Sequence, residues 1–205
     1  MIRLNAIIMA AGQSRRFGSN KLLLPLQGKP IIQHLLDQFP FQLFHQVVLV
    51  YSHEQVRTIA KNYPLILCHN EHPSLGKWQT IQLGLKTCDD AEGTLFLVAD
   101  QPLLKEVTII TLAETFRQHP TRIIRPIIAD KPGNPVFFPA SCLQELKSLQ
   151  GDIGGRTVIR QHSDLLMPIP FNDPNEFIDI DTPETYNKLT ELCLDKEYQG
   201  DKDNG

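Results

Sequence analysis

Short apolar runs separated by amphipathic segments are the feature of this sequence that most limits its fold. Residues 4–9, 46–51, 65–68 and 94–99 are largely apolar, and they are too short for buried helices. Between them, residues 31–36, 54–62 and 78–87 repeat apolar side chains at helical spacing. Strands that are apolar on both faces and alternate with helices are typical of a parallel sheet covered on both sides. We therefore predict a three-layer α/β/α protein with a mostly parallel central sheet.

The second half of the chain shows weaker patterns of the same kind. Residues 122–128, 136–138 and 177–180 have the composition of short strands, and residues 142–149 and 157–162 that of helices. Thr182 and Pro183 are typical of a helix start, since Thr is a good cap and Pro fits the first turn. We expect one domain over residues 1–194 and a disordered polar tail over residues 195–205.

Composition limits the classes of partner. Of the 205 residues, 41% are hydrophobic and 21% are charged, as in ordinary folded domains. The net charge of -3 argues against a protein that binds nucleic acid by neutralising many phosphates. No apolar run approaches the roughly 20 residues that span a bilayer. We expect a cytoplasmic protein that has neither nucleic acid nor a membrane as its partner.

The loop after the first predicted strand is suited to phosphate binding. In open parallel sheets ligands bind where the strands end, which draws attention to residues 10–21. Small side chains there let backbone N–H groups approach an anion, and Arg16 and Lys21 supply positive charge. The spacing matches neither the P-loop nor the dinucleotide fingerprint. A plain strand-to-helix turn with solvated basic residues is the alternative interpretation.

Aspartates at the ends of later strands are candidate metal ligands. Asp100 follows five apolar residues, so its carboxylate emerges at the ligand edge, where Mg²⁺ takes oxygen ligands. An aspartate shortly before Pro102 is equally typical of a helix cap. Asp179 and Asp181 alternate along the last predicted strand, so only one of them can join Asp100. We favour Asp181 as the metal partner, with Asp179 as a structural residue.

Other loops rich in turn residues are candidates for the rest of a binding site. Residues 70–76 follow the third predicted strand and could converge with the first loop. Residues 133–135 and 151–156 lie in the second half of the chain, where a pocket for a second substrate could form. For these last two loops, a structural turn is at least as good an interpretation.

These motifs, taken in order, resemble one known family. The segment Ala10-Ala11-Gly12-x-Ser14-x-Arg16-x-Gly18-x-x-Lys21 closely resembles the nucleotide-binding signature AAGxSxRMGxxK of the molybdenum cofactor cytidylyltransferases. The resemblance covers nearly the whole predicted domain and continues through Gly76-x-x-x-Thr80, Asp100-Gln101-Pro102, Gly133-Asn134-Pro135, Gly151-Asp152-x-Gly154-x-Arg156 and Asp179-Ile180-Asp181-Thr182-Pro183.

The resemblance implies a Rossmann-like nucleotidyltransferase. Its reaction would move CMP from Mg-CTP to the phosphate of a molybdopterin-type cofactor, releasing pyrophosphate and forming the cytosine dinucleotide. It also implies Mg²⁺ as the metal cofactor, with Mn²⁺ as a substitute that the same oxygen ligands accept. The product would pass to a xanthine dehydrogenase-type molybdoenzyme or its chaperone.

Position by position, the resemblance assigns a role to each matching residue. Catalytic roles fall to Lys21, Arg16 and Asp100, and metal binding to Asp100 and Asp181. Nucleotide binding falls to Ala10, Ala11, Gly12, Gln13, Ser14, Arg16, Lys21, Gly76, Thr80 and Asp100. Acceptor binding falls to Gly133, Asn134, Pro135 and Asp152.

Departures from the family pattern leave rival activities open. Phe17 replaces the usual Met, Lys77 stands where an apolar residue is usual, and residues 128–132 lack a Tyr/Gly-containing loop. The nearest rival is a molybdopterin guanylyltransferase, whose signature has Gly at the position of Ala11; one methyl group discriminates by only about 1–3 kcal/mol. A sugar-phosphate nucleotidyltransferase is a second rival. A non-catalytic nucleotide-binding or cofactor-delivery protein is a third, of another class.

Overall fold

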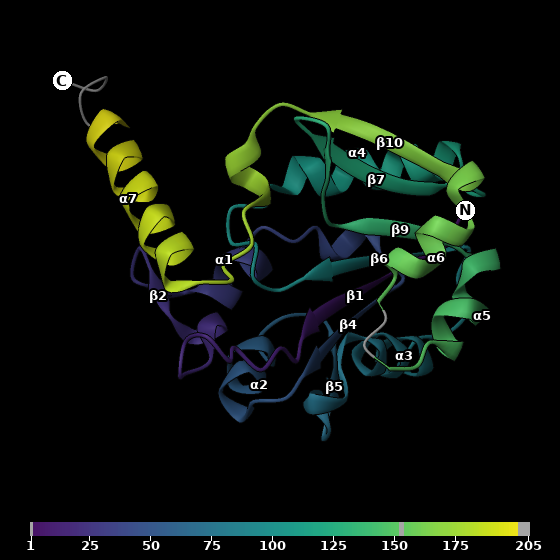
Figure 1. The fold of residues 1–205 in the computed structure, drawn as a ribbon, viewed down its shortest axis with the longest axis horizontal. Helices are drawn as coiled ribbons and strands as arrows, with labels where there is room; N and C mark the ends of the chain where they lie inside the picture. The colour runs from purple at the N-terminus through teal and green to yellow at the C-terminus, as the bar shows by residue number, and fades with distance from the viewer. Residues whose placement is uncertain (1, 152–153, 201–205) are drawn as a thin grey trace.

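A single twisted sheet forms the centre of the molecule. The computed structural model describes residues 2–151 and 154–200. Within them, eight strands form the main sheet in the order β10-β7-β9-β6-β1-β4-β5, with β8 paired to β7. The strands are β1 (Leu4–Ala10), β4 (Gln46–Tyr51), β5 (Ile66–His69), β6 (Gly93–Val98), β7 (Ile123–Ile128), β8 (Lys131–Pro132), β9 (Val136–Pro139) and β10 (Leu166–Phe171). Figure 1 shows β1 near the middle of this sheet.

Parallel pairing dominates the sheet, as the sequence predicts. β1 runs parallel to β4 and β6, β4 to β5, and β7 to β10. β9 is antiparallel to both of its neighbours, β6 and β7. The start of β9 therefore lies at the same edge as the ends of the parallel strands, because Val136 is the partner of Phe96.

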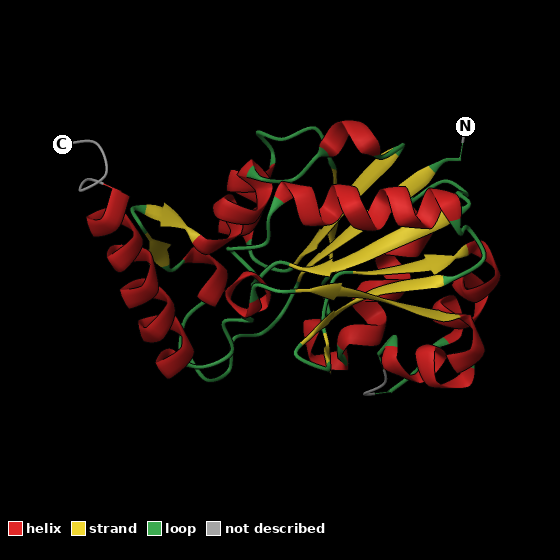
Figure 2. Cartoon of the chain, turned by 90° about the horizontal axis from the view of Figure 1, so that it is seen from above, coloured by secondary structure: helices red, strands yellow, loops and turns green. Residues whose placement is uncertain are grey.

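Helices cover both faces of the sheet, so the three-layer prediction is confirmed (Figure 2). One core contains buried residues of α1 (Ile31–Asp37), α2 (Glu54–Ala60) and α4 (Glu106–Gln118). The other contains buried residues of α3 (Lys77–Thr87), α5 (Ala140–Ser148) and α6 (Arg156–Gln161). Side chains of β1 alternate between the two cores, with Ile8 in the first and Ile7 in the second.

The last helix lies at one end of the molecule, beside a small hairpin (Figures 1 and 2). α7 (Pro183–Gly200) starts where the sequence predicts, and Thr182 Oγ1 accepts a hydrogen bond from the Thr185 nitrogen. The hairpin consists of β2 (Pro25–Leu26) and β3 (Lys29–Pro30). The helix extends six residues past the domain boundary expected at residue 194. Residues 201–205 of the expected tail lie outside the described residues. Among the described residues, no helix is both long and apolar enough to span a membrane.

One predicted strand is wrong. Residues 177–180 do not pair with the sheet; a short 3-10 helix, η5 (Pro174–Phe177), leads into an irregular segment that carries Asp179 and Asp181. Its apolar residues reflect core packing, since Ile180 is fully buried. The backbone nitrogen of Ile180 instead donates to the carbonyl oxygen of Asp100 at 3.0 Å. Strand alternation therefore does not decide which of the two aspartates can join Asp100.

Candidate active site

The loop after β1 folds back on itself and presents Lys21. Ser14 adopts a positive φ of 48°, and Gly18 one of 66°, a backbone region that glycine enters without strain. The Ser14 carbonyl accepts a hydrogen bond from the Phe17 nitrogen at 2.9 Å, and the Ser14 side chain accepts one from the Lys21 nitrogen at 3.0 Å. Asn20 caps the following 3-10 helix, η1 (Lys21–Leu23). These local bonds fix where the Lys21 side chain starts.

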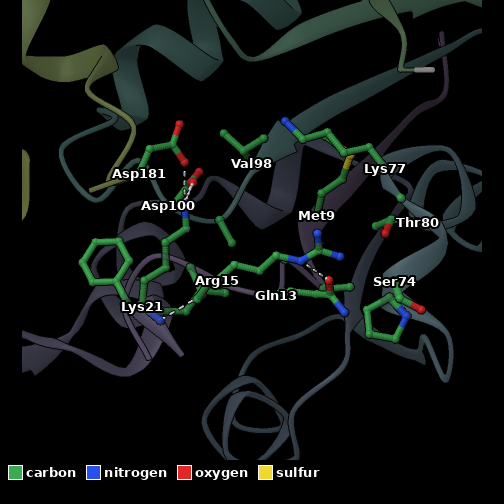
Figure 3. Close-up of a pocket in the computed structure, with 18 of the residues that line it drawn as sticks. Met9, Gln13, Arg15, Lys21, Ser74, Lys77, Thr80, Val98, Asp100 and Asp181 are labelled. Carbon is green, nitrogen blue, oxygen red and sulfur yellow. Dashed lines mark hydrogen bonds and ion pairs between the residues drawn. The ribbon is translucent and has the colours of Figure 1, made fainter. Parts of the chain in front are cut away.

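The Lys21 ammonium joins two carboxylates that lie far apart in the sequence. Lys21 Nζ donates a hydrogen bond to Asp100 Oδ2 and a second, at 2.8 Å, to Asp181 Oδ1. The side chains of Lys21 and Asp100 are 12% and 14% exposed, whereas that of Asp181 is 61% exposed. Figure 3 shows Lys21 extending toward both carboxylates. The sequence-predicted trio of Lys21, Asp100 and Asp181 is thus brought together.

The charges in this cluster shift the proton affinities of its members. Burial lowers the pKa of Lys21, but the charges and hydrogen bonds of Asp100 and Asp181 outweigh it, so the net pKa is raised. The hydrogen bond from Lys21 holds the pKa of Asp181 below its usual value, and the charges of Lys77 and Arg16 act in the same direction. The cluster therefore stabilises both charged forms.

Asp179 also belongs to this cluster, although the sequence predicts only a structural role for it. Burial, and then the negative charges of Asp100 and Asp181, raise the pKa of Asp179 to about 6. One carboxylate oxygen of Asp179, Oδ1, is buried without a hydrogen-bond partner among the described residues, as is Asp100 Oδ1. Three carboxyl groups therefore act on one another in a space where Lys21 is in contact with two of them.

A cavity of about 670 Å³ opens beside the cluster. Most of the predicted nucleotide and metal residues line it: Ala11, Gly12, Gln13, Ser14, Arg16, Lys21, Gly76, Thr80, Asp100 and Asp181. Ala10 does not, since it is only 1% exposed and packs in the core. The predicted stretch after β5 also reaches the cavity, through η3 (Pro73–Leu75).

Further basic side chains of the cavity received no role in the sequence prediction. Arg15 lines it, and its Nε donates to Gln13 Oε1 at 2.8 Å, so its side chain extends toward Gln13 (Figure 3). Lys77 lines it from the start of α3. Arg15 could have been identified from the sequence, because it lies next to Arg16 in the loop after β1. Lys77 stands out in the sequence only as a departure from the family pattern.

The predicted acceptor loop lies at the same edge of the sheet but does not line this cavity. The Gly133 nitrogen donates a hydrogen bond to the Pro126 carbonyl at 2.9 Å, and the Gly133 carbonyl accepts one from Arg125 Nε at 2.9 Å. Asn134 and Pro135, joined by a cis peptide bond, lead directly into β9. Asp152, the remaining predicted acceptor residue, lies outside the described residues.

Asp100 and Asp181 are the candidate protein ligands for a divalent cation. No group of three or more His, Cys, Asp or Glu side chains is arranged as a ready metal site in the described part of the chain. Two carboxylates nevertheless converge on one positive charge, the Lys21 ammonium, and Asp100 keeps a buried oxygen without a partner there. Mg²⁺ is commonly held by one or two carboxylates together with substrate phosphates and water, so this donor set fits it.

A family model matches most of the chain. The model described as "MobA-like NTP transferase domain" matches residues 6–165. The match includes the loop after β1 and Asp100, and it ends before the segment that carries Asp181.

Two curated proteins illustrate the similarity in sequence. "Purine catabolism protein PucB" of Bacillus subtilis is 28% identical over 197 residues, covering 89% of this chain and 94% of that protein. "Bifunctional protein GlmU" of Nitrosomonas eutropha is 31% identical over 118 residues, covering 56% of this chain but only 26% of that protein. The second match is therefore confined to a part of a much longer protein.

Solved structures share the fold. Rv0371c of Mycobacterium tuberculosis superposes with a TM-score of 0.79 at 22% identity, covering 93% of this chain and 98% of that one. The molybdopterin-guanine dinucleotide biosynthesis protein A of Archaeoglobus fulgidus gives a TM-score of 0.71 at 20% identity, covering 93% and 99%. At these identities the likeness establishes the Rossmann-like fold of the chain.

Proposed function

The chain belongs to the MobA-like NTP transferase family and is a nucleotidyltransferase, and we propose that it transfers CMP from CTP to the phosphate of a molybdopterin-type cofactor. The observation that carries the proposal is the position of Lys21. Its ammonium lies between Asp100 and Asp181 at the side of a cavity that the loop after β1 also lines. This arrangement suits a triphosphate, whose charge needs both cationic side chains and a metal held by carboxylates.

The reaction needs positioning rather than a protein nucleophile. An oxygen of the acceptor phosphate attacks the α-phosphorus of CTP in line, the bond from that phosphorus to the bridging oxygen breaks, and pyrophosphate leaves. Lys21 and Arg16 neutralise charge that develops on the phosphates, and Gly12 and Gln13 line the cavity beside them. The acceptor phosphate is already ionised near neutral pH, so no general base is required.

Mg²⁺ is the cofactor that this site would hold, with Mn²⁺ as a substitute. Asp100 and Asp181 would supply its protein ligands, and the metal would neutralise charge on the triphosphate. Lys21 would then exchange its contacts with the two carboxylates for contacts with the nucleotide. One solved structure of Rv0371c is a complex with manganese, which agrees with a divalent metal at this fold.

Ala11 favours CTP over GTP. It is 5% exposed and lines the cavity, so its methyl group takes up space that glycine would leave free for a larger purine. A single methyl contributes only about 1–3 kcal/mol to such a choice. The preference for cytosine therefore rests on the family resemblance as well as on this contact.

The family resemblance and one curated relative support the proposed acceptor. The loop of Gly133, Asn134 and Pro135, together with Asp152, would bind it from the β9 side of the sheet. PucB is named as a purine catabolism protein, and xanthine is a purine. That name agrees with delivery of the product to a xanthine dehydrogenase-type molybdoenzyme or its chaperone.

Pyrophosphate release by the purified protein tests donor and acceptor together. CTP, GTP, ATP and UTP are compared at equal concentration with Mg²⁺, each with molybdopterin-type cofactor and each without it. We expect release with CTP that depends on the cofactor. Release with GTP alone would support guanylyl transfer instead.

A second set of acceptors addresses the remaining rivals. Release that requires a sugar phosphate in place of the molybdopterin-type cofactor would assign the chain to sugar-nucleotide synthesis. Binding of CTP without turnover of any acceptor would contradict an enzyme and favour a nucleotide-binding or cofactor-delivery protein.

A further inference from the structure

The segment that carries Asp181 has no strand to hold it. Residues 178–181 follow η5 and pair with no strand of the sheet, so the ladder of backbone bonds that usually fixes such residues does not reach them. Asp181 nevertheless meets the same ammonium group as Asp100. Something other than sheet pairing must therefore set the distance between these two carboxylates.

Contacts between this segment and the residues after Asp100 supply the missing connection. The Ile180 nitrogen donates to the Asp100 carbonyl at 3.0 Å. Further from the site, Gln101 Nε2 donates to the Phe177 carbonyl at 3.2 Å, and Gln101 itself is 1% exposed. The two segments thus run side by side and are joined at two points close to the carboxylates.

Glu176 makes the third and most distant connection. It is a buried acidic residue, 4% exposed, and its Oε1 accepts a hydrogen bond from the Lys105 backbone nitrogen at 3.1 Å. Lys105 is the residue before α4 and has no side-chain cap of its own, so Glu176 satisfies a backbone donor at the start of that helix. Lys105 Nζ also lies 3.5 Å from Glu176 Oε2 and 2.8 Å from Asp173 Oδ2.

We propose that Glu176 is a positioning residue for metal binding, because its bond to the Lys105 nitrogen holds the segment of Asp181 in place beside Asp100. The proposal rests on the proposed function in one respect, since it takes Asp100 and Asp181 as the metal ligands. α4 is a thirteen-residue helix packed on the sheet through Ile109, Leu112 and Phe116, so it provides a rigid anchor. Glu176 links the segment of Asp181, which no strand holds, to that anchor.

Three substitutions separate the backbone bond from the ion pair. Glu176→Ala removes the acceptor for the Lys105 nitrogen and leaves a donor without its partner. Glu176→Gln keeps a side-chain oxygen that can accept this bond but loses the negative charge. Lys105→Met keeps the backbone nitrogen and loses the ion pairs of a side chain that is 50% exposed.

The readout is Mn²⁺ affinity in the presence of CTP, measured from the electron paramagnetic resonance signal of free Mn²⁺. We expect Glu176→Ala to raise the half-saturating Mn²⁺ concentration at least tenfold. Glu176→Gln and Lys105→Met should stay within about threefold of the native protein. In turnover assays, Glu176→Ala should lower kcat and raise the metal requirement while the KM for CTP at saturating metal changes by less than about threefold.

A core variant separates positioning from general loss of stability. Leu146→Ala, in α5 on the other face of the sheet, removes a side chain that is 1% exposed and should lower the Tm at least as much as Glu176→Ala does. We expect it to leave Mn²⁺ affinity unchanged. Equal affinity in Glu176→Ala and the native protein would overturn the positioning role alone. Failure of the native protein to bind Mn²⁺ with CTP would instead remove the metal site itself, and this inference with it.

Discussion

The side-chain oxygen of Ser14 accepts a hydrogen bond from the backbone nitrogen of Lys21 at 3.0 Å, across seven positions of the loop after β1. The Ser14 backbone is in the left-handed region, and its side chain reaches the first residue of η1. The bond closes the loop at the point from which the Lys21 side chain departs. The loop and the carboxylate cluster are therefore connected through Lys21.

Replacing Ser14 by alanine tests this connection between the loop and Lys21. Ser14→Ala removes one hydrogen bond of about 1 kcal/mol without adding bulk, so kcat/KM should fall by about three- to tenfold. Pyrophosphate release under subsaturating CTP measures the effect. The neighbouring variant Ser19→Ala, in the same loop but outside the cavity lining, serves as the control and should retain native kinetics.

Lys21 should matter more for turnover than for nucleotide binding. Removing its charge in Lys21→Ala takes away stabilisation of charge that develops on the phosphates, so kcat should fall on the order of 10²- to 10³-fold. The Kd for CTP, measured by calorimetry, should change by about tenfold or less. Lys29→Ala offers a matched control, since Lys29 is 53% exposed and pairs with Asp37 outside the cavity. Native turnover in Lys21→Ala would refute the mechanism.

Asp100 should be required for metal-dependent activity and dispensable for folding. In Asp100→Ala we expect turnover to fall at least 100-fold at any Mg²⁺ concentration, because the proposed metal site would lose one of its two carboxylate ligands. Circular dichroism should show the native content of helix and strand. Asp89→Ala removes a carboxylate that is 71% exposed and should leave metal dependence as it is.

Two glycines should separate activity from stability. A Cβ added at Gly12 meets no heavy atom within 4 Å, so Gly12→Ala should fold normally, but its methyl group enters the cavity and should weaken CTP binding. A Cβ added at Gly84 would lie 2.6 Å from a side-chain carbon of Ile7, where α3 packs on β1. Gly84→Ala should therefore destabilise the protein by about 1–3 kcal/mol. Urea unfolding and a CTP titration of both variants check this contrast.

Tyr63 should make stability sensitive to alkaline pH. Burial, followed by its hydrogen bond to Asp37, raises the pKa of Tyr63 to about 12. The folded state thus favours the neutral phenol, so this contribution is complete below the unfolded pKa of about 10 and is lost as pH rises toward 12. The urea midpoint should fall over that range, and it should fall less in Tyr63→Phe. Identical pH profiles for the two proteins would contradict the shifted pKa.

The strands nearest the site follow directly from the sequence, whereas the edge of the sheet does not. β1 and β4 are continuous apolar runs with no competing interpretation, and the sequence places their ends within one residue. β10 escapes prediction because Pro168 and Pro170 argue against a strand. It forms because it is an edge strand, and the two prolines lie two residues apart, so both missing N–H groups point the same way, where no partner is needed.

α4 also escapes prediction, for a different physical reason. Its first half contains Val107, Thr108, Ile109, Ile110 and Thr111, which are β-branched residues of low helix propensity. The helix is stabilised by packing, since Ile109, Leu112, Ala113 and Phe116 are all buried on one side. Local composition therefore misleads where tertiary contacts decide.

The candidate site is predictable where its residues directly follow a strand. Ser14 and Lys21 follow β1 and Asp100 follows β6, and their convergence is expected because the ends of parallel strands meet at one edge of the sheet. The contribution of Asp179 and the connection through Glu176 are not predictable, since both depend on a segment that pairs with no strand of the sheet. Both become visible only when the segment of Asp179 and Glu176 is seen beside Asp100 and Lys105 in the folded chain.

The antiparallel direction of β9 has a consequence for how this fold can diversify. The turn that feeds into β9 emerges beside the ends of the parallel strands, yet it belongs to a different stretch of chain from the loop that follows β1. Insertions or replacements in one of these loops leave the backbone of the other intact. Under the proposed function, the loop after β1 would bind the nucleotide and the turn before β9 the acceptor, so substitutions in one loop would change the choice of one substrate and leave the site of the other in place.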